Sequence, residues 1–82
     1  MEDVSPVVTE HAFKHEIAGA DIFHAFRFAM RRFGPDDRGF VMAIGAARDG
    51  RTLLEVGFYP SLDGPDVIVH AMPARPKYLR DW

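Results

Sequence analysis

The residues best suited to acid–base chemistry on a charged substrate lie close together near the C-terminus. His70 stands between the apolar residues Ile68 and Met72, and Arg75 and Lys77 follow it closely. A histidine exchanges protons near neutral pH, and the planar fork of an arginine binds phosphate oxygens in pairs. We therefore predict that His70 and Arg75 are catalytic and that Lys77 binds phosphate. The alternative for His70 is a structural role, with its ring bonded to a backbone carbonyl.

A second basic group lies in the middle of the chain. Arg27 and Arg31 are four residues apart, about one turn of a helix, and His24 precedes them. We predict that the two arginines bind phosphate across a groove from the C-terminal group, to which Arg80 also belongs, with His24 as a secondary candidate. The alternative is that arginines at the end of a helix complement its dipole and bind no ligand.

His11 and His15 are also four residues apart, a spacing that permits two metal ligands on one helix face. No further histidine or carboxylate completes such a site, so we predict no metal. His15 is kept as a secondary candidate for the site, beside an interface or capping role. Gly45 and Gly50 have the context of strand and turn glycines rather than of a phosphate-binding loop, and no cofactor is predicted.

Length and composition limit the function further. The 82 residues predict a single domain over 1–82, and the net charge of −2 excludes a whole-surface footprint for nucleic acid. The absence of cysteine favours the reducing cytoplasm, and no apolar run is long enough to span a membrane. Seven phenylalanines are more than so small a core needs, which indicates an interface, with a homodimer as one form of it.

The first part of the chain predicts helices. Residues 1–8 read as an entry segment with a short edge strand at Val7 and Val8, followed by a helical pair over 9–33. The first helix is expected over about 10–16. The second carries a stripe at spacings of three and four, and Gly34-Pro35 is expected to end it. The stripe consists of Ile22, Phe23, Phe26, Met30 and Phe33.

The second part predicts strands. Apolar runs over 40–47, 52–59 and 67–72 form an expected β-meander within 39–74, and Asp49-Gly50 between the first two is a strong hairpin signal. In the last strand, alternation places Ile68, His70 and Met72 on one face. A basic tail over 75–82 follows, whose aromatic residues suit either stacking on a base or packing against the sheet or a partner. The predicted fold is α+β: two N-terminal helices packed on a three- to four-stranded antiparallel β-meander.

Three segments resemble the BrnT-type toxins, a family with a RelE-like fold. Lys14-His15-Glu16-Ile17 is similar to the segment that joins the family's helices, and 41–51 is similar to its first long strand and Asp-Gly-Arg hairpin. Residues 67–75 resemble the family's final strand, and the ending His-Ala-Met-Pro-Ala-Arg-Pro-Lys resembles that of small actinobacterial proteins. The similarity extends over about residues 9–80.

The resemblance implies a RelE/BrnT-like fold and the toxin component of a type II toxin–antitoxin system. It also implies a metal-independent endoribonuclease that binds RNA and is neutralised by a cognate antitoxin protein. Two positions depart from the family pattern, since Met72 stands where the family has an arginine and His70 where it has a serine. Either Arg75 compensates, or the chain is a non-catalytic interaction module or oligomer of the same fold.

Overall fold

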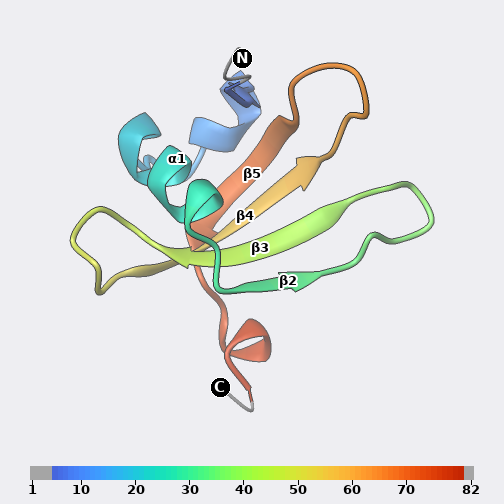
Figure 1. Ribbon diagram of the computed structural model, residues 1–82. Coiled ribbons are helices and arrows are strands. Elements are labelled where there is room, and N and C mark those ends of the chain that lie inside the picture. Colours follow the sequence, from blue (N-terminus) through green and yellow to red (C-terminus); the bar gives the residue numbers. More distant parts are fainter. Residues whose placement is uncertain (1–4, 81–82) are drawn as a thin grey trace.

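A computed structural model describes residues 5–80, in which one sheet carries a helix on one side (Figure 1). The strands are β1 (Val7–Val8), β2 (Arg31–Phe33), β3 (Val41–Ala46), β4 (Leu53–Tyr59) and β5 (Val67–Pro73). The helical elements are the 3₁₀ turn η1 (Glu10–Phe13), the α-helix α1 (Gly19–Arg27) and the 3₁₀ turn η2 (Pro76–Tyr78). The strands lie in the order β1-β5-β4-β3-β2.

The α+β class is confirmed, but the predicted sheet was wrong in size and type. It has five strands and is mixed, because β1 pairs with β5 in parallel while the other three pairings are antiparallel. The edge strand expected at Val7 and Val8 is present. The strands expected over 40–47, 52–59 and 67–72 are present as β3, β4 and β5.

The predicted pair of N-terminal helices was also wrong. In residues 5–80, α1 is the one α-helix, and the segment expected to form the first helix holds only the 3₁₀ turn η1. The predicted second helix ends at Arg27 instead of continuing to Phe33, because Arg31–Phe33 pairs with β3. The turn at Gly34-Pro35 therefore links two strands rather than ending a helix. Two members of the apolar stripe, Met30 and Phe33, stay 57% and 38% exposed.

The two faces of the sheet are covered differently. The helix face carries Ala43, Val56 and Phe58, which form one buried cluster with Ile22 and Ala25 of α1. The opposite face, here called the tail face, carries the residues that alternate with these along the strands, because successive side chains of a strand point to opposite sides. Its members on the three longest strands include Met42, Ile44, Glu55, Gly57, Tyr59, His70 and Met72.

A β-bulge decides which residues of β5 point to which face. Gly57 pairs with His70, but the next residue, Phe58, pairs with Ile68, so β5 has one extra residue at Val69. Ile68 and Ala71 therefore both point into the helix-face core, although an odd number of positions separates them. The predicted grouping of Ile68 with His70 and Met72 was wrong for this reason.

Helix α1 lies very close to the sheet at one glycine. A Cβ at Gly45 would overlap the backbone carbonyl of Ala25, so only a residue without a side chain fits at this point of β3. The helix is held at its other contacts by apolar packing, including an edge-to-face pair between Phe26 and Phe58 with ring centroids 4.9 Å apart. Gly45 is thus a strand glycine, as expected, and it is also a site of close helix–sheet approach.

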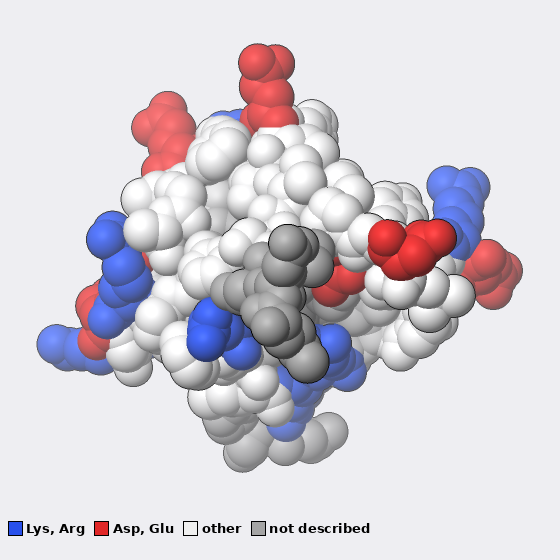
Figure 2. Space-filling view, turned by 45° about the horizontal axis from the view of Figure 1, so that its top comes forward, with Lys and Arg blue, Asp and Glu red and all other residues white. Residues whose placement is uncertain are grey.

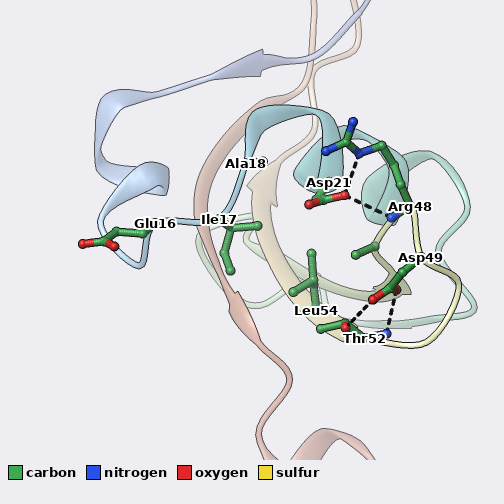
Figure 3. A pocket seen from close by; sticks show the side chains of 9 residues that line it. Glu16, Ile17, Ala18, Asp21, Arg48, Asp49, Thr52 and Leu54 are labelled. Carbon is green, nitrogen blue, oxygen red and sulfur yellow. Dashed lines mark hydrogen bonds and ion pairs between the residues drawn. The ribbon is translucent and has the colours of Figure 1, made fainter.

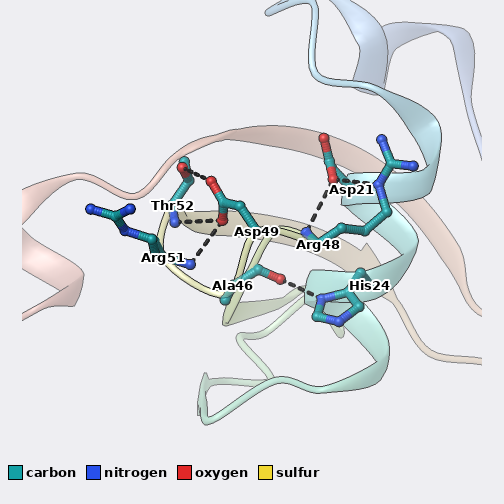
Figure 4. A network of polar contacts seen from close by, with 7 residues as sticks. All are labelled: Asp21, His24, Ala46, Arg48, Asp49, Arg51 and Thr52. Carbon is teal, nitrogen blue, oxygen red and sulfur yellow. Dashed lines mark hydrogen bonds and ion pairs between the residues drawn. The ribbon is translucent and has the colours of Figure 1, made fainter.

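The β3–β4 turn is held by local polar contacts (Figure 4). The Asp49 carboxylate accepts hydrogen bonds from the backbone N–H groups of Arg51 and Thr52 at 2.8 and 2.9 Å and from the Thr52 hydroxyl at 2.7 Å. These bonds lower the pKa of Asp49 to about 2. Gly50 has a φ of 72°, in the left-handed region that a glycine adopts without strain. The hairpin predicted from Asp49-Gly50 is therefore confirmed.

The chain after β5 returns across the tail face. Ala74 donates its N–H to Leu53 O at 2.9 Å, and η2 then brings Tyr78 against Phe33 of β2, with ring centroids 5.3 Å apart. Figure 1 shows this segment leaving the end of β5 and passing β2 before the C-terminus. The expected helical turn of the tail is present as η2, while the expected packing of Trp82 and part of the expected 1–8 segment lie outside the described residues.

Candidate active site

A buried carboxylate lies at the centre of the tail face. Glu55 stands in the middle of β4, a strand with neighbours on both sides, and its side chain is 0% exposed. A charged group out of water is tolerated only when donors surround it. Arg75 and His70 supply those donors, and within residues 5–80 no buried side-chain nitrogen or oxygen lacks a partner.

Arg75 binds Glu55 with both its backbone and its side chain. The Arg75 N–H donates to Oε1 at 3.0 Å, Nε lies 3.0 Å from Oε1, and Nη2 donates to Oε2 at 2.7 Å. This is the paired geometry of an arginine fork on a carboxylate. The three guanidinium nitrogens diverge from one carbon, so Nη1 points away from Glu55. The Arg75 side chain is 44% exposed, so this outer side reaches solvent.

His70 shares the same carboxylate. Its Nε2 lies 2.8 Å from Glu55 Oε2, and this nitrogen donates because a carboxylate oxygen only accepts. The contact differs from the backbone-carbonyl bond considered as the structural alternative. The ring is part-buried, with 25% of the side chain exposed, and it stands opposite Gly57 of β4.

The charge of Glu55 is maintained in spite of its burial. Burial raises the pKa of Glu55, but the hydrogen bonds from Arg75 and His70 outweigh it and leave this pKa below its ordinary value. The same contact raises the pKa of Arg75, since the charged guanidinium is bonded to a carboxylate. Glu55 is therefore an anion in the folded protein and holds a cation and an imidazole side by side.

His15 comes to this group from a distant part of the sequence. The rings of His15 and His70 lie edge to face with centroids 6.0 Å apart. The parallel pairing of β1 with β5 carries η1 alongside β5, and Glu16 then reverses the chain with a φ of 61°. His15 is exposed, so two imidazoles and one guanidinium face solvent within a small area.

Of the predicted phosphate-binding residues, Lys77 lies against the same Tyr78 ring as Arg75. Lys77 lies with its Nζ 5.0 Å from the centre of the Tyr78 ring, and Arg75 is 5.5 Å from the same centre. Arg31 lies in β2 rather than in a helix, and its Nη1 donates to the backbone carbonyl of Arg80 at 2.7 Å. Arg31 therefore anchors the tail segment, and Arg80 is exposed at its end.

The structure does not bring Arg27 and His24 to the tail face. Both belong to α1, which packs on the helix face of the sheet. His24 Nδ1 donates to Ala46 O at 2.8 Å, a contact that joins the helix to the end of β3 (Figure 4). Arg27 lies against the ring of Phe28, 5.7 Å from its centre.

A hollow elsewhere on the molecule carries no predicted site residue. It has a volume of about 610 Å³ and lies between the start of α1 and the β3–β4 turn, where Ile17, Leu54 and the Asp21–Arg48 pair line it (Figure 3). That pair is exposed, with Arg48 Nε 2.8 Å from Asp21 Oδ1. The hollow is open, and Leu54 in its lining belongs to the buried cluster of the helix face.

No cluster of metal ligands accompanies the Glu55 group in the part of the chain that the structure describes. Within residues 5–80, no set of three or more histidine, aspartate or glutamate side chains is arranged to hold a metal ion. On the face drawn in Figure 2, basic and acidic side chains are scattered around a largely uncharged surface. No helix in the part of the chain that the structure describes is long and apolar enough to cross a membrane.

Sequence reasoning missed Glu55. The signal for it was a single acid within the otherwise apolar run Leu-Leu-Glu-Val-Gly-Phe. A lone charge at the centre of a buried strand requires partners, and these had to come from elsewhere in the chain. His70 and Arg75 had been predicted separately for their own chemistry, and Glu55 is what brings them together.

The fold has a counterpart among solved structures. The ribonuclease toxin BrnT of Brucella abortus matches with a TM-score of 0.68 and 23% identity, over 89% of this chain and 99% of the other. The predicted likeness in fold to the BrnT-type toxins is thus confirmed. No protein-family model matches the chain, and no curated protein sequence matches it.

Proposed function

We propose that the protein is a ribonuclease toxin that cleaves RNA, without a metal ion, at the group formed by His15, Glu55, His70 and Arg75. The observation that carries the proposal is the buried Glu55 carboxylate, which holds a histidine and an arginine side by side at the surface of the tail face. The likeness in fold to a ribonuclease toxin supports it. The matching fold does not by itself determine the chemistry, which has to come from these side chains.

Each residue has a role in the cleavage step. His70 Nδ1 takes the proton of a ribose 2′-hydroxyl, and the 2′ oxygen forms a bond to the adjacent phosphorus. Arg75 and Lys77 neutralise the charge that develops on the phosphate oxygens. The bond from phosphorus to the 5′ oxygen breaks, and His15 supplies the proton to that oxygen. The products are a 2′,3′-cyclic phosphate and a 5′-hydroxyl end.

The position of Arg75 supports the idea that it replaces the arginine expected in the final strand. Met72, which stands at that position, pairs with Glu55 across the β4–β5 ladder. Arg75 places its guanidinium on the same carboxylate from three residues further along. A positive charge is thereby present beside His70 although the strand itself carries none at this point.

The proposed partner is a protein antitoxin encoded alongside, as in a type II system, and the proposed compartment is the cytoplasm. A toxin that cleaves RNA must be neutralised by such a partner in the cell that makes it. The neighbouring open reading frame is the candidate for this role, and its co-expression is expected to relieve growth arrest.

The test is cleavage of a single-stranded RNA by the purified protein in the presence of a chelator. We expect 2′,3′-cyclic phosphate ends, and a loss of about a hundredfold or more in rate for His70→Ala and for Arg75→Ala. His11→Ala and Arg51→Ala are matched controls, because both side chains are exposed and neither is among the groups bonded to the Glu55 carboxylate. Cleavage at the wild-type rate by both His70→Ala and Arg75→Ala would discard the site.

A second candidate function is a non-catalytic interaction module or oligomer. It is favoured by the exposure of Phe28 and Met30, each 57% exposed beside the edge strand β2. Sedimentation velocity of the wild type and of Phe28→Asp tests it. Self-association that Phe28→Asp abolishes, in a protein that leaves RNA intact, would favour this function over the toxin.

A further inference from the structure

Two aromatic side chains lie together on the tail face next to His70. Phe40 precedes β3 and Tyr59 ends β4, and their ring centroids are 5.4 Å apart at an interplanar angle of 66°. Tyr59 follows Glu55 and Gly57 at alternate positions of β4, so it points to the same face as Glu55. Neither ring belongs to the helix-face core.

Gly57 determines how close these rings come to His70. A Cβ at Gly57 would overlap Cζ of Phe40, would lie 2.8 Å from its Cε1, and would lie 3.2 Å from Cβ of His70. The Phe40 ring therefore lies on the bare backbone of β4, directly beside the histidine. Any larger residue at position 57 would push the ring away from the site.

Tyr59 presents a surface that the other tyrosine near the site does not. Tyr78 has Arg75 and Lys77 lying over its ring, at 5.5 and 5.0 Å from the centre. Among the described residues, neither Phe40 nor Tyr59 has a cation over its ring, and Tyr59 is 39% exposed. An exposed tyrosine supported by a second ring is a platform on which a flat ligand can stack.

The spacing suits a polymer whose charged group lies beside His70, the residue that pairs with Gly57. Tyr59 is two residues beyond Gly57, which is roughly 6.6 Å along a strand. This is comparable to one nucleotide of an extended single strand. A phosphate bound beside His70 would thus place a flanking base over the ring of Tyr59. A base in a duplex is already stacked on both sides, so only an unpaired one can lie there.

We propose that Phe40 and Tyr59 form a stacking subsite for an unpaired RNA base beside the bond cleaved at His70, which rests on the proposed ribonuclease function. Tyr59 contacts the base, and Phe40 positions Tyr59 from below. Stacking accepts any base because every base has a flat π face, with purines favoured through their larger area. The subsite makes the protein selective for single-stranded RNA without requiring a defined sequence.

The first measurement is binding of a single-stranded 2′-fluoro RNA oligonucleotide that carries 2-aminopurine, whose fluorescence falls when it stacks. The oligonucleotide has no 2′-hydroxyl and is not cleaved. We expect quenching by the wild type, none with the same strand in a duplex, and binding about tenfold to a hundredfold weaker for Tyr59→Ala. Tyr59→Leu, which keeps the bulk of the side chain, should lose the quenching equally, whereas Tyr59→Trp should keep it.

The control is Phe28→Ala, since Phe28 is an exposed aromatic residue at the end of α1, on the other side of the sheet. This variant should bind and quench as the wild type does. Equal binding and quenching by Tyr59→Ala and Tyr59→Leu would overturn the subsite.

Cleavage of the unmodified RNA separates the two proposals. If the wild type cleaves and Tyr59→Leu has a raised KM, both stand. If both proteins cleave with the same KM, the subsite is wrong and the ribonuclease function is retained. If the wild type cleaves nothing, the proposed function fails, and the subsite as a part of it fails too.

Discussion

The two faces of the sheet are both buried at their centres, but by different means. On the helix face, Val56 and Phe58 pack against Ile22 and Ala25 in an apolar cluster. On the tail face, Glu55 is equally inaccessible, and it is stabilised by Arg75 and His70 rather than by apolar neighbours.

Apolar burial and burial of a bonded carboxylate contribute differently to the free energy of folding. Apolar burial stabilises the fold at about 25 cal/mol for each Å² removed from water and does not require particular partners. A buried carboxylate costs several kcal/mol unless every donor is in place, and so adds little net stability. Apolar packing on the helix face therefore supplies most of the stability of the fold. Within that fold, the tail face holds a charged group in one geometry.

The largest expected effect is on the helix face. Phe58→Ala removes a ring that is 1% exposed and should lower the free energy of unfolding by about 3–5 kcal/mol. Urea unfolding measures this, with Phe28→Ala as a control that should change the value by about 0.5 kcal/mol or less because that ring is exposed. Equal losses in the two variants would contradict the assignment of the core.

The second-largest effect on stability is expected for Glu55, and a loss of RNA cleavage should distinguish it from the helix-face residue Phe58. Glu55→Gln keeps the shape of the side chain but removes its charge and replaces one of the two oxygens that accept from Arg75 and His70 with an NH2 donor. We expect a loss of about 1–3 kcal/mol in stability and of about a hundredfold in the rate of RNA cleavage. Phe58→Ala should retain full cleavage for each folded molecule. Full cleavage by Glu55→Gln would show that the site does not depend on this carboxylate.

The acid dependence of stability should also come partly from the tail face. The pKa of Glu55 is held below its ordinary value of 4.5, so its charged form stabilises the fold above that pH. This contribution is lost as the pH falls through the lowered pKa. Asp49, with a pKa of about 2, adds a second loss below its ordinary 3.8. Urea unfolding between pH 6 and 2 should show a flatter decline in Glu55→Gln, and an unchanged slope would argue against the lowered pKa.

The smallest effect is expected for the exposed ion pair beside the hollow. Asp21 and Arg48 are in contact, but water screens the pair, whose Arg48 side chain is 59% exposed. Asp21→Asn should therefore leave Tm almost unchanged in a thermal scan at moderate salt. A decrease in Tm as large as the one caused by Glu55→Gln would contradict the expected contrast between exposed and buried ion pairs.

Local signals predicted much of the sheet. Asp49-Gly50 is a turn that a few neighbouring residues make by themselves, since Asp49 accepts three bonds from Arg51 and Thr52. The apolar runs on either side of it became β3 and β4 within one residue of the expected bounds. The edge strand at Val7 and Val8 was likewise apparent, although its parallel pairing with β5 was not.

Non-local pairing overrode local pattern in two places. The spacing of Met30 and Phe33 continues the helical stripe. Arg31–Phe33 nevertheless pairs with the outer edge of β3 and is therefore a strand. In β5, alternation alone assigns Ile68 and His70 to the same face, and the bulge opposite Gly57 and Phe58 separates them. Neither outcome is visible until two strands are placed side by side.

The sequence by itself determined the chemical groups available and the segments able to form strands, because residue type, alternation and turn chemistry are local properties. It determined His70 and Arg75 as candidates in this sense. The tertiary structure alone decided that both meet on Glu55, that His15 joins them and that Arg27 does not. Those contacts join residues 15 to 55 positions apart, and no local preference specifies which distant segment completes a buried charge.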